Sequence, residues 1–243
     1  MVTLWGLTDR GLVRRENQDA CAYAARAGEY AWAVVCDGMG GAAAGDLASA
    51  MAVSRFQNHM VCLDEPEEYQ EEGQLLVQAA EAANRAVYLK ASANRAYAGM
   101  GTTLVGALLR ENTLWVVNVG DSRAYHITKE AIQRITRDHS VVEDLVQKGD
   151  LTPEEARRHP QKNLITRALG TTRQVKVDLF QQTVKEGDAI LLCSDGLVNE
   201  VTDGEIWKET LAGGTPEEIC RRLLDRTLAE GAPDNVTIVL FQL

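Results

Sequence analysis

The stretch that decides the fold is YAWAVVCDGMGG, residues 30–41. Residues 30–36 form an unbroken apolar run of the length that is typical of a buried β-strand. The run leads directly into Asp37-Gly38, so the expected strand ends in a carboxylate and a glycine turn. A single Asp-Gly pair is most often an ordinary hairpin turn. A carboxylate that follows a buried strand is also well placed to face a cleft, and for this pair alone both interpretations stay open.

Apolar patterns on either side of this stretch indicate a protein in which strands and helices are intermixed. Apolar and alternating runs predict strands, the first of them at a sheet edge, over residues 2–8, 30–36, 102–109, 113–119, 123–127, 131–135, 175–181, 188–193 and 236–243. Apolar residues at helical spacing predict helices over residues 45–54, 73–93, 140–148, 203–211 and 215–229.

The segment 149–170 differs from its surroundings. It contains DLTPEE, residues 150–155, which has the N-cap and first-turn proline typical of a short helix. Basic or ionisable side chains follow at Arg157, Arg158, His159 and Lys162. One interpretation is a solvated surface loop, and the other is a mobile flap beside an active site, whose basic side chains attract negatively charged substrate segments. No linker or repeat divides the chain, so residues 1–243 are expected to form one domain that carries this flap.

The composition excludes several classes of protein. The 243 residues include 25 Lys and Arg against 35 Asp and Glu, and the formal charge of −10 argues against binding to nucleic acid or an anionic membrane. No apolar run approaches the ~20 residues of a membrane-spanning helix, and the N-terminus does not resemble a secretory signal. Five scattered cysteines without a C-x-x-C pair indicate free thiols in a reducing cytoplasm. Four histidines without metal-ligand spacing argue against a histidine-based zinc site.

Aspartates lie at the ends of expected strands or in turns at five places. These residues are Asp19, Asp37, Asp121, Asp195 and Asp234. Carboxylates, backbone carbonyls and water are hard oxygen donors, which favour Mg²⁺ or Mn²⁺ over zinc or copper. Clustered carboxylates repel one another unless cations neutralise them. If these aspartates meet in the fold, they therefore predict a site for divalent cations.

Seven short motifs in a fixed order carry a resemblance to a known family. They are RRENQD (14–19), DGMGG (37–41), GMGTT (99–103), VGDSR (119–123), DHS (138–140), SDGL (194–197) and DNVT (234–237). In these motifs the chain resembles the metal-dependent protein phosphatases, also called PPM or type 2C serine/threonine phosphatases. The compact length and Met39 resemble the bacterial single-domain branch of that family.

The resemblance implies a fold and a metal site. The implied fold is α+β, an αββα four-layer sandwich of two antiparallel sheets flanked by pairs of helices. The implied cofactor is a pair of Mn²⁺ or Mg²⁺ ions bridged by Asp37. The carbonyl of Gly38 and the carboxylates of Asp195 and Asp234 match the remaining ligands of these ions.

Three further residues complete the implied site. Asp19 matches a residue that holds metal-bound water, and Asp121 matches a ligand of a third, weaker metal that is shared with Asp195. Arg14 matches a phosphate clamp, because a guanidinium fork suits a phosphomonoester dianion. The simpler interpretation of Arg14 is a solvated charge beside a turn, and Arg15 is interpreted as such a surface charge.

The chain departs from the wider family pattern at two positions. Met39 stands where some members carry His, and no His occurs in residues 41–45, so a histidine general acid is not expected there. Asn199 stands where members often carry a carboxylate, which predicts a weaker third metal site. His139 is expected to be a structural histidine bonded to the backbone, and Cys193 a core residue rather than a catalyst.

The resemblance implies hydrolysis of phosphoserine and phosphothreonine monoesters by a metal-activated water, without a protein nucleophile. Two alternatives stay open: a phosphohydrolase of small phosphoesters, and a non-catalytic module that binds phosphoproteins. The second is disfavoured because the matched acidic metal positions are all still carboxylates. The expected partners are phosphorylated proteins and a eukaryotic-like Ser/Thr kinase with its substrates. The chain is expected to be a cytoplasmic monomer that binds neither nucleic acid nor membrane.

Overall fold

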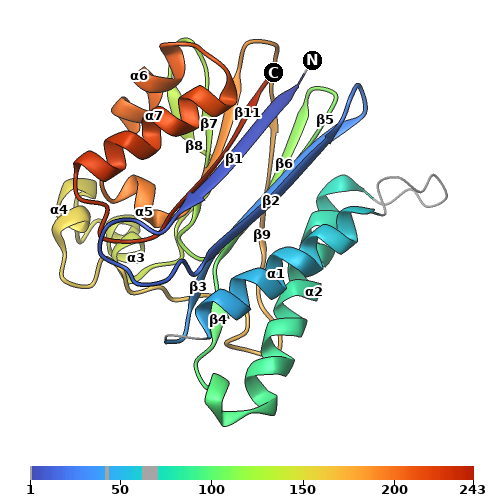
Figure 1. Ribbon diagram of the computed structural model, residues 1–243, viewed down its shortest axis with the longest axis vertical. Helices are drawn as coiled ribbons and strands as arrows, with labels where there is room; N and C mark the ends of the chain where they lie inside the picture. The colour runs from blue at the N-terminus through green and yellow to red at the C-terminus, as the bar shows by residue number, and fades with distance from the viewer. Residues whose placement is uncertain (1, 42–43, 62–70) are drawn as a thin grey trace.

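Two antiparallel β-sheets pack face to face and helices cover both outer faces in the computed structural model of the protein (Figure 1). The structure describes residues 2–41, 44–61 and 71–243. Cys62, counted above among the cysteines, and the alanines at 42 and 43 lie outside the described residues. The arrangement of layers confirms the αββα sandwich expected from the sequence.

The first sheet contains both ends of the chain. Its strands, in spatial order, are β1 (Thr3–Asp9), β11 (Val236–Gln242), β10 (Ala189–Cys193), β7 (Arg123–Ile127) and β8 (Ile132–Arg134). β1 lies at the edge, as predicted, and pairs with β11 from Thr3 opposite Gln242 to Asp9 opposite Val236. This register places Asp9, Cys193 and the start of β11 at the end of the sheet away from the chain termini.

The second sheet is built around the strand that contains the apolar run of residues 30–36. Its strands, in spatial order, are β2 (Asp19–Arg26), β3 (Tyr30–Met39), β5 (Leu104–Arg110), β6 (Thr113–Val119) and β9 (Asp178–Thr183), with β4 (Gly101–Thr102) paired to the end of β3. β5 and β6 form an antiparallel hairpin, and Glu111 in its turn has a φ of 52°.

β3 is apolar throughout because both of its faces are covered. Ala33 and Val35 face the core between the two sheets, whereas Trp32, Val34 and Cys36 face the helices on the other side. A strand buried on both faces shows a continuous apolar run instead of alternation, which explains the continuous apolar sequence of residues 30–36.

The helices α1 (Gly45–Met60) and α2 (Glu72–Ala93) cover the outer face of the second sheet (Figure 1). Phe56 of α1 is fully buried and lies over Gly106 of β5, where a Cβ atom would come within 2.7 Å of the Phe56 ring. α1 extends to Met60 rather than ending at residue 54, because its buried face continues through Phe56 and Met60.

The outer face of the first sheet is covered by α6 (Asp203–Leu211) and α7 (Pro216–Ala229), with the short α5 (Asp195–Val198) directly after β10. α6 and α7 each begin with a capping box, in which a Thr hydroxyl and a Glu carboxylate satisfy the first backbone N–H groups. Ile219 and Leu223 of α7 pack on Leu191 and Ile238 of the sheet.

The segment 149–170 follows α3 (Val141–Lys148) in the chain and precedes β9, the next strand. It contains the predicted short helix, α4 (Pro153–Arg158), with a capping box between Thr152 and Glu155. A single 3₁₀ turn, η2 (Arg95–Tyr97), follows α2. No helix within the described ranges is long and apolar enough to cross a membrane.

Two strand predictions need correction. β2 was not predicted, because its sequence DACAYAAR is rich in alanine, which has low strand propensity. It forms because it pairs with β3 over its whole length, from Asp19 to Arg26. β9 begins at Asp178 instead of residue 175, since its pairing with β6 starts at Asn118 opposite Asp178.

Candidate active site

A cavity of about 580 Å³ opens at the end of the sandwich away from the chain termini. Four of the five aspartates line it: Asp37, Asp121, Asp195 and Asp234. The fifth, Asp19, is buried and lies opposite Asp37 in the pairing of β2 with β3. The structure therefore brings together the acidic residues that the sequence analysis singled out.

Both sheets contribute to this acidic group, since strands of both sheets end at the same edge. Asp19 and Asp37 belong to the second sheet, and Asp121 follows its strand β6. Asp195 follows β10 and Asp234 precedes β11 in the first sheet. The cleft is consequently a property of the assembled sandwich and not of either sheet alone.

Asp37-Gly38 is not a hairpin turn. Both residues continue β3, and Gly38 pairs with Thr102 of β4. A Cβ at Gly38 would collide with the backbone carbonyl oxygen of Gly45 at the start of α1. Only glycine therefore allows this strand end to lie so close to the helix and to line the cavity.

Asp19 is held by two hydroxyl groups from the first sheet. Its Oδ2 accepts hydrogen bonds of 2.7 Å from Ser194 Oγ and 2.7 Å from Thr237 Oγ1. Its Oδ1 is buried without a hydrogen-bond partner. Asp195 repeats this arrangement, because its Oδ2 accepts a bond from Asn199 Nδ2 while its Oδ1 is buried and unpaired.

Burial and mutual repulsion make the charged form of these aspartates unfavourable. Burial raises the pKa of Asp19 to about 7 and that of Asp195 to about 6, and neighbouring aspartates add to both rises. The pKa values of Asp37 and Asp121 lie well above the usual range for the same reasons. Such a group is stable in its charged form only when cations lie beside it.

The donor set fits hard divalent cations. Unpaired, buried carboxylate oxygens are the atoms that a cation would take, and all the donors are oxygen. No three or more His, Cys, Asp or Glu side chains in the described part of the chain form a ready-made metal-binding group. Backbone carbonyls and water would therefore have to complete the shell of any ion held here, as magnesium sites commonly require.

Arg14 lies at the mouth of the cleft. Its Nη2 donates a hydrogen bond of 2.8 Å to Asp234 Oδ2, and its side chain remains largely exposed. Arg15, interpreted from the sequence as a surface charge, also lines the cavity. Two guanidinium groups thus stand beside the acidic floor, where a phosphate group would need positive charge.

Several polar residues that hold the site were not predicted. Thr103 Oγ1 accepts a bond of 2.9 Å from the Asp37 N–H, and it lies 2.7 Å from Ser122 Oγ. Asn235 accepts from the Gln18 N–H and donates to two carbonyls of the 10–18 loop. Each of these residues neighbours a predicted aspartate or belongs to one of the seven motifs. That position in the sequence could have indicated their role at the site.

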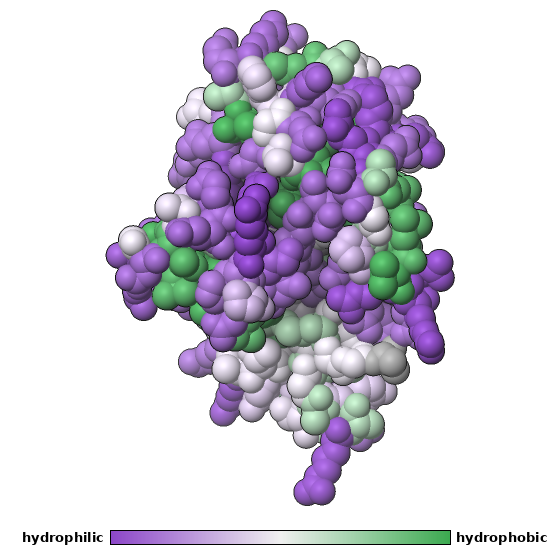
Figure 2. All heavy atoms as spheres, turned by 90° about the vertical axis from the view of Figure 1, so that its left-hand side faces the viewer, coloured by the Kyte–Doolittle hydropathy of each residue, from purple (hydrophilic) through white to green (hydrophobic). Residues whose placement is uncertain are grey.

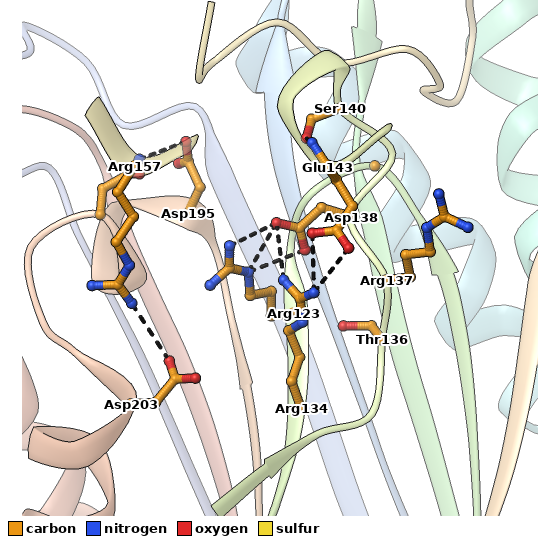
Figure 3. A network of polar contacts seen from close by, with 12 residues as sticks. Arg123, Arg134, Thr136, Arg137, Asp138, Ser140, Glu143, Arg157, Asp195 and Asp203 are labelled. Carbon is orange, nitrogen blue, oxygen red and sulfur yellow. Dashed lines mark hydrogen bonds and ion pairs between the residues drawn. The ribbon is translucent and has the colours of Figure 1, made fainter. Parts of the chain in front are cut away.

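A network of buried ion pairs lies next to the acidic group (Figure 3). Arg123 binds Asp138 through Nε and Nη2, and Arg134 contacts the same carboxylate from the neighbouring strand. Arg123 Nη1 also donates to the hydroxyl of Tyr125, which donates to Asp203 on α6. The positive charge of Arg123 lowers the pKa values of Asp121 and Asp195, against the larger effect of burial.

His139 has the structural role expected from the sequence. Its Nδ1 accepts a bond of 2.9 Å from the Gly120 N–H, and its Nε2 lies 3.1 Å from Asp178 Oδ2. Burial lowers the pKa of His139, so the neutral ring is the favoured form. Cys193 is fully buried in the core and burial raises its pKa, which agrees with a core residue rather than a nucleophile.

Comparison with known proteins identifies the family. The model of the protein phosphatase 2C family matches residues 13–229. The serine/threonine phosphatase stp of Listeria innocua is 35% identical over 238 residues, which are 97% of this chain and 93% of that protein. The chain therefore belongs to the protein phosphatase 2C family.

Solved structures agree with this assignment. The serine/threonine phosphatase Stp1 from Staphylococcus aureus superposes with a TM-score of 0.91 at 38% identity, covering 100% of this chain and 95% of that one. The catalytic domain of the phosphatase PstP, solved in complex with two manganese ions, has a TM-score of 0.87 at 36% identity. That comparison covers 99% of this chain and 97% of the other.

Proposed function

We infer that the chain is a metal-dependent serine/threonine protein phosphatase, and we propose which of its residues perform the reaction. The phosphatase class follows from family membership. The observation that carries the residue assignment is the group of five aspartates around one cleft, two of which keep buried carboxylate oxygens without partners. Phosphorylated proteins are accordingly the substrates.

Mn²⁺ or Mg²⁺ is the proposed cofactor, as two ions in the cleft. Asp37 would bridge them, and the Gly38 carbonyl, Asp195 and Asp234 would complete their protein ligands. The manganese pair in the related PstP structure supports this assignment. Two such ions supply a water of lowered pKa and neutralise the charge of a phosphate group.

The remaining site residues are proposed to position water and substrate. Asp19 would hold water beside the ions, while Ser194 and Thr237 fix its carboxylate. Asp121 would help to hold a third, weaker ion together with Asp195. Asn199 Nδ2 donates to Asp195 Oδ2, so this oxygen is shared between a hydrogen bond and the proposed third ion. This sharing supports weak binding of the third ion.

Arg14 is proposed to bind the phosphate dianion of the substrate. Its guanidinium group already contacts a carboxylate at the mouth of the cleft, so its side chain can present two parallel donors there. Met39, which also lines the cavity, has no proton to donate. Residues 38–45 contain no histidine, so a group elsewhere has to protonate the leaving oxygen.

We also propose the organisation and setting of the enzyme. Residues 1–243 would act as one phosphatase domain, with 149–170 as a flap beside the cleft. Asn163 and Ile165 of this segment line the cavity, which supports that placement. A monomeric cytoplasmic enzyme that opposes a eukaryotic-like Ser/Thr kinase would fit the acidic charge and free cysteines.

One assay series tests the function. The purified protein should hydrolyse p-nitrophenyl phosphate only with Mn²⁺ or Mg²⁺, and EDTA should abolish turnover. A phosphothreonine peptide should be a better substrate, by kcat/KM, than small phosphoesters such as glycerol phosphate. Faster turnover of the small phosphoesters would favour the first alternative. Phosphopeptide binding without turnover in any metal would favour the binding module.

A further inference from the structure

Large apolar side chains are exposed at few places in the described residues, and three of them lie beside the cleft. The exposed set is Leu12, Val13, Val61, Leu89, Leu164, Leu179 and Leu211. Leu12 and Val13 directly precede Arg14, and Leu164 lies between Asn163 and Ile165. Arg14, Asn163 and Ile165 line the cavity. Their exposed fractions are 63%, 67% and 51%.

The loop that carries Leu12 and Val13 is fixed to the body of the protein. The Leu12 N–H donates a bond of 2.9 Å to the Ala232 carbonyl, and Gly11 before it has a φ of 72°. Asn235 Nδ2 donates to the carbonyls of Arg10 and Glu16 on either side. The two apolar side chains therefore point into solvent from an anchored backbone.

Leu164 is anchored in a similar way. Its N–H donates to the Gln161 carbonyl and its carbonyl accepts from the Val141 N–H, both at 3.0 Å. The next residue, Ile165, forms an isolated β-bridge with Ser140. Leu164 thus belongs to the fixed base of the 149–170 segment.

The cavity-lining residues next to these three in sequence are mostly polar or charged, among them Arg14 and Asn163. Figure 2 shows the side of the molecule that carries α4 and α6, where hydrophilic side chains predominate and hydrophobic ones gather in small separate patches. Single exposed apolar side chains are common on protein surfaces. These three are distinguished by their position next to residues that line the cavity and by the anchored backbone that carries them.

We propose that Leu12, Val13 and Leu164 form an apolar rim that binds apolar side chains next to the phosphorylated residue of the substrate protein. This inference rests on the proposed phosphatase function. All substrates share the phosphate group, so its recognition in the cleft does not distinguish one phosphoprotein from another. Selection among phosphoproteins therefore has to come from contacts around the cleft.

Charge and position favour a phosphoprotein segment as the occupant. The same loop presents Leu12 and Val13 directly before Arg14 and Arg15, so apolar and cationic groups lie side by side. A segment that is both phosphorylated and partly apolar complements this combination. A second copy of this chain would bring its own charge of −10 to the contact, which opposes self-association.

The test compares two phosphothreonine peptides that differ only beside the phosphothreonine. One has Leu at both adjacent positions and the other has Ser. With Mn²⁺, the wild-type protein should prefer the Leu peptide by about tenfold in kcat/KM, the discrimination that a modest apolar contact provides. The double variant Leu12→Ser/Val13→Ser and the single variant Leu164→Ser should each reduce this ratio towards one.

Leu89→Ser is the matched control. Leu89 is 62% exposed on α2, outside the residues that line the cavity, so this variant should keep the wild-type ratio. A ratio near one in the wild-type protein, or an unchanged ratio in both rim variants, would overturn the proposal. Light scattering that shows a dimer dissolved by the double variant would assign the rim to self-association and overturn it too.

Failure of the phosphatase function has a different signature. In that case neither peptide is hydrolysed with any metal, and peptide binding is measured by fluorescence anisotropy in place of turnover. Tighter binding of the Leu peptide, lost in the rim variants and kept in Leu89→Ser, would still support the rim. Equal binding of the two peptides would reject it.

Discussion

Asp37 lies where the negative charge of the cleft is most concentrated. Asp19, Asp195, Asp121 and Asp234 all contribute to the rise of its pKa, after the larger effect of burial. Because the proposed bridging role places this carboxylate at both ions, we expect Asp37→Asn to lower kcat/KM for p-nitrophenyl phosphate by at least about 100-fold. Asp121→Asn should cost much less, since Asp121 is proposed to hold only the third ion.

Calorimetry with Mn²⁺ measures the same assignment without turnover. Asp37→Asn should bind the metal much more weakly than the wild-type protein, and Asp195→Asn and Asp234→Asn should resemble it. Asp19→Asn should have a milder effect, since Asp19 is proposed to hold water beside the ions. Two-site Mn²⁺ binding of normal affinity in Asp37→Asn would contradict the bridging role.

Arg14 offers a second test at the level of one side chain. The proposed contact forms with the bound dianion before chemistry begins, so Arg14→Ala should mainly raise KM, by about tenfold. Arg14→Lys keeps the charge but not the planar fork, and should give an intermediate KM. Mn²⁺ affinity should be nearly unchanged, because the pair with Asp234 is exposed. An unaltered KM with a collapsed kcat would require a different role.

Four of the five aspartates could be predicted from the sequence because they lie at strand ends or turns that the local pattern reveals. Asp19 begins β2, which the pattern missed, and its signal was the motif RRENQD. The residues that hold them could not be predicted in this way. Ser194 and Thr237 reach Asp19 across separations of 175 and 218 positions, which exist only once the two sheets meet. Arg15 is exposed, as expected of a surface charge, and only the assembled fold shows that it also lines the cavity.

At the scale of elements, local pattern predicted most strands and helices and failed where pairing overrides propensity. β3 and β10 are covered on both faces, so their sequences are continuously apolar. β2 shows no such pattern, because alanine fills half of its positions and strand formation comes from the ladder with β3. A strand defined by its partner cannot be read from its own residues.

α4 is held to the body by an ion pair that the sequence did not reveal. Arg157 Nη2 lies 3.9 Å from Asp203 Oδ1 at the start of α6 (Figure 3). The same carboxylate oxygen accepts a hydrogen bond from the Tyr125 hydroxyl. Arg157 was expected to attract substrate together with Arg158. Because Arg157 lies beside Asp203, we expect it to help position the 149–170 segment, and its role in attracting substrate stays a prediction.

Arg157→Gln and Arg158→Gln form a matched pair, since both remove one charge from the same turn of α4. We expect Arg157→Gln to speed amide hydrogen exchange in α4 by about two- to fivefold, as loss of an exposed ion pair would. Its ratio of phosphoprotein to p-nitrophenyl phosphate turnover should also fall. Arg158→Gln should change only turnover of phosphoproteins, and only at low salt. Equal exchange in the two variants would show that the Asp203 contact does not hold α4.

At the scale of the whole molecule, the acidic cleft sets how stability depends on pH. Burial raises the pKa of Asp19 to about 7 and that of Asp195 to about 6, from an ordinary value of 3.8. Without metal, the folded protein therefore keeps protons that the unfolded chain has already released. This contribution to stability is fully present below about pH 4 and is lost as the pH rises through the folded-state values. Divalent cations reverse this pH dependence, so that stability rises with pH, because they stabilise the charged carboxylates of the folded protein.

Thermal unfolding in EDTA should accordingly show a midpoint that falls from pH 5 to pH 8. The expected fall is at least about 3 °C, the shift that 1 kcal/mol produces in a chain of this size. Saturating Mn²⁺ should raise the midpoint most at pH 8, where the released carboxylates bind it best. Asp37→Asn removes one charge from the group, so its decline in EDTA should be shallower and its gain from Mn²⁺ smaller. A midpoint in EDTA that rises over this range would show that these aspartates do not repel one another in the fold, and the metal assignment would lose its physical basis.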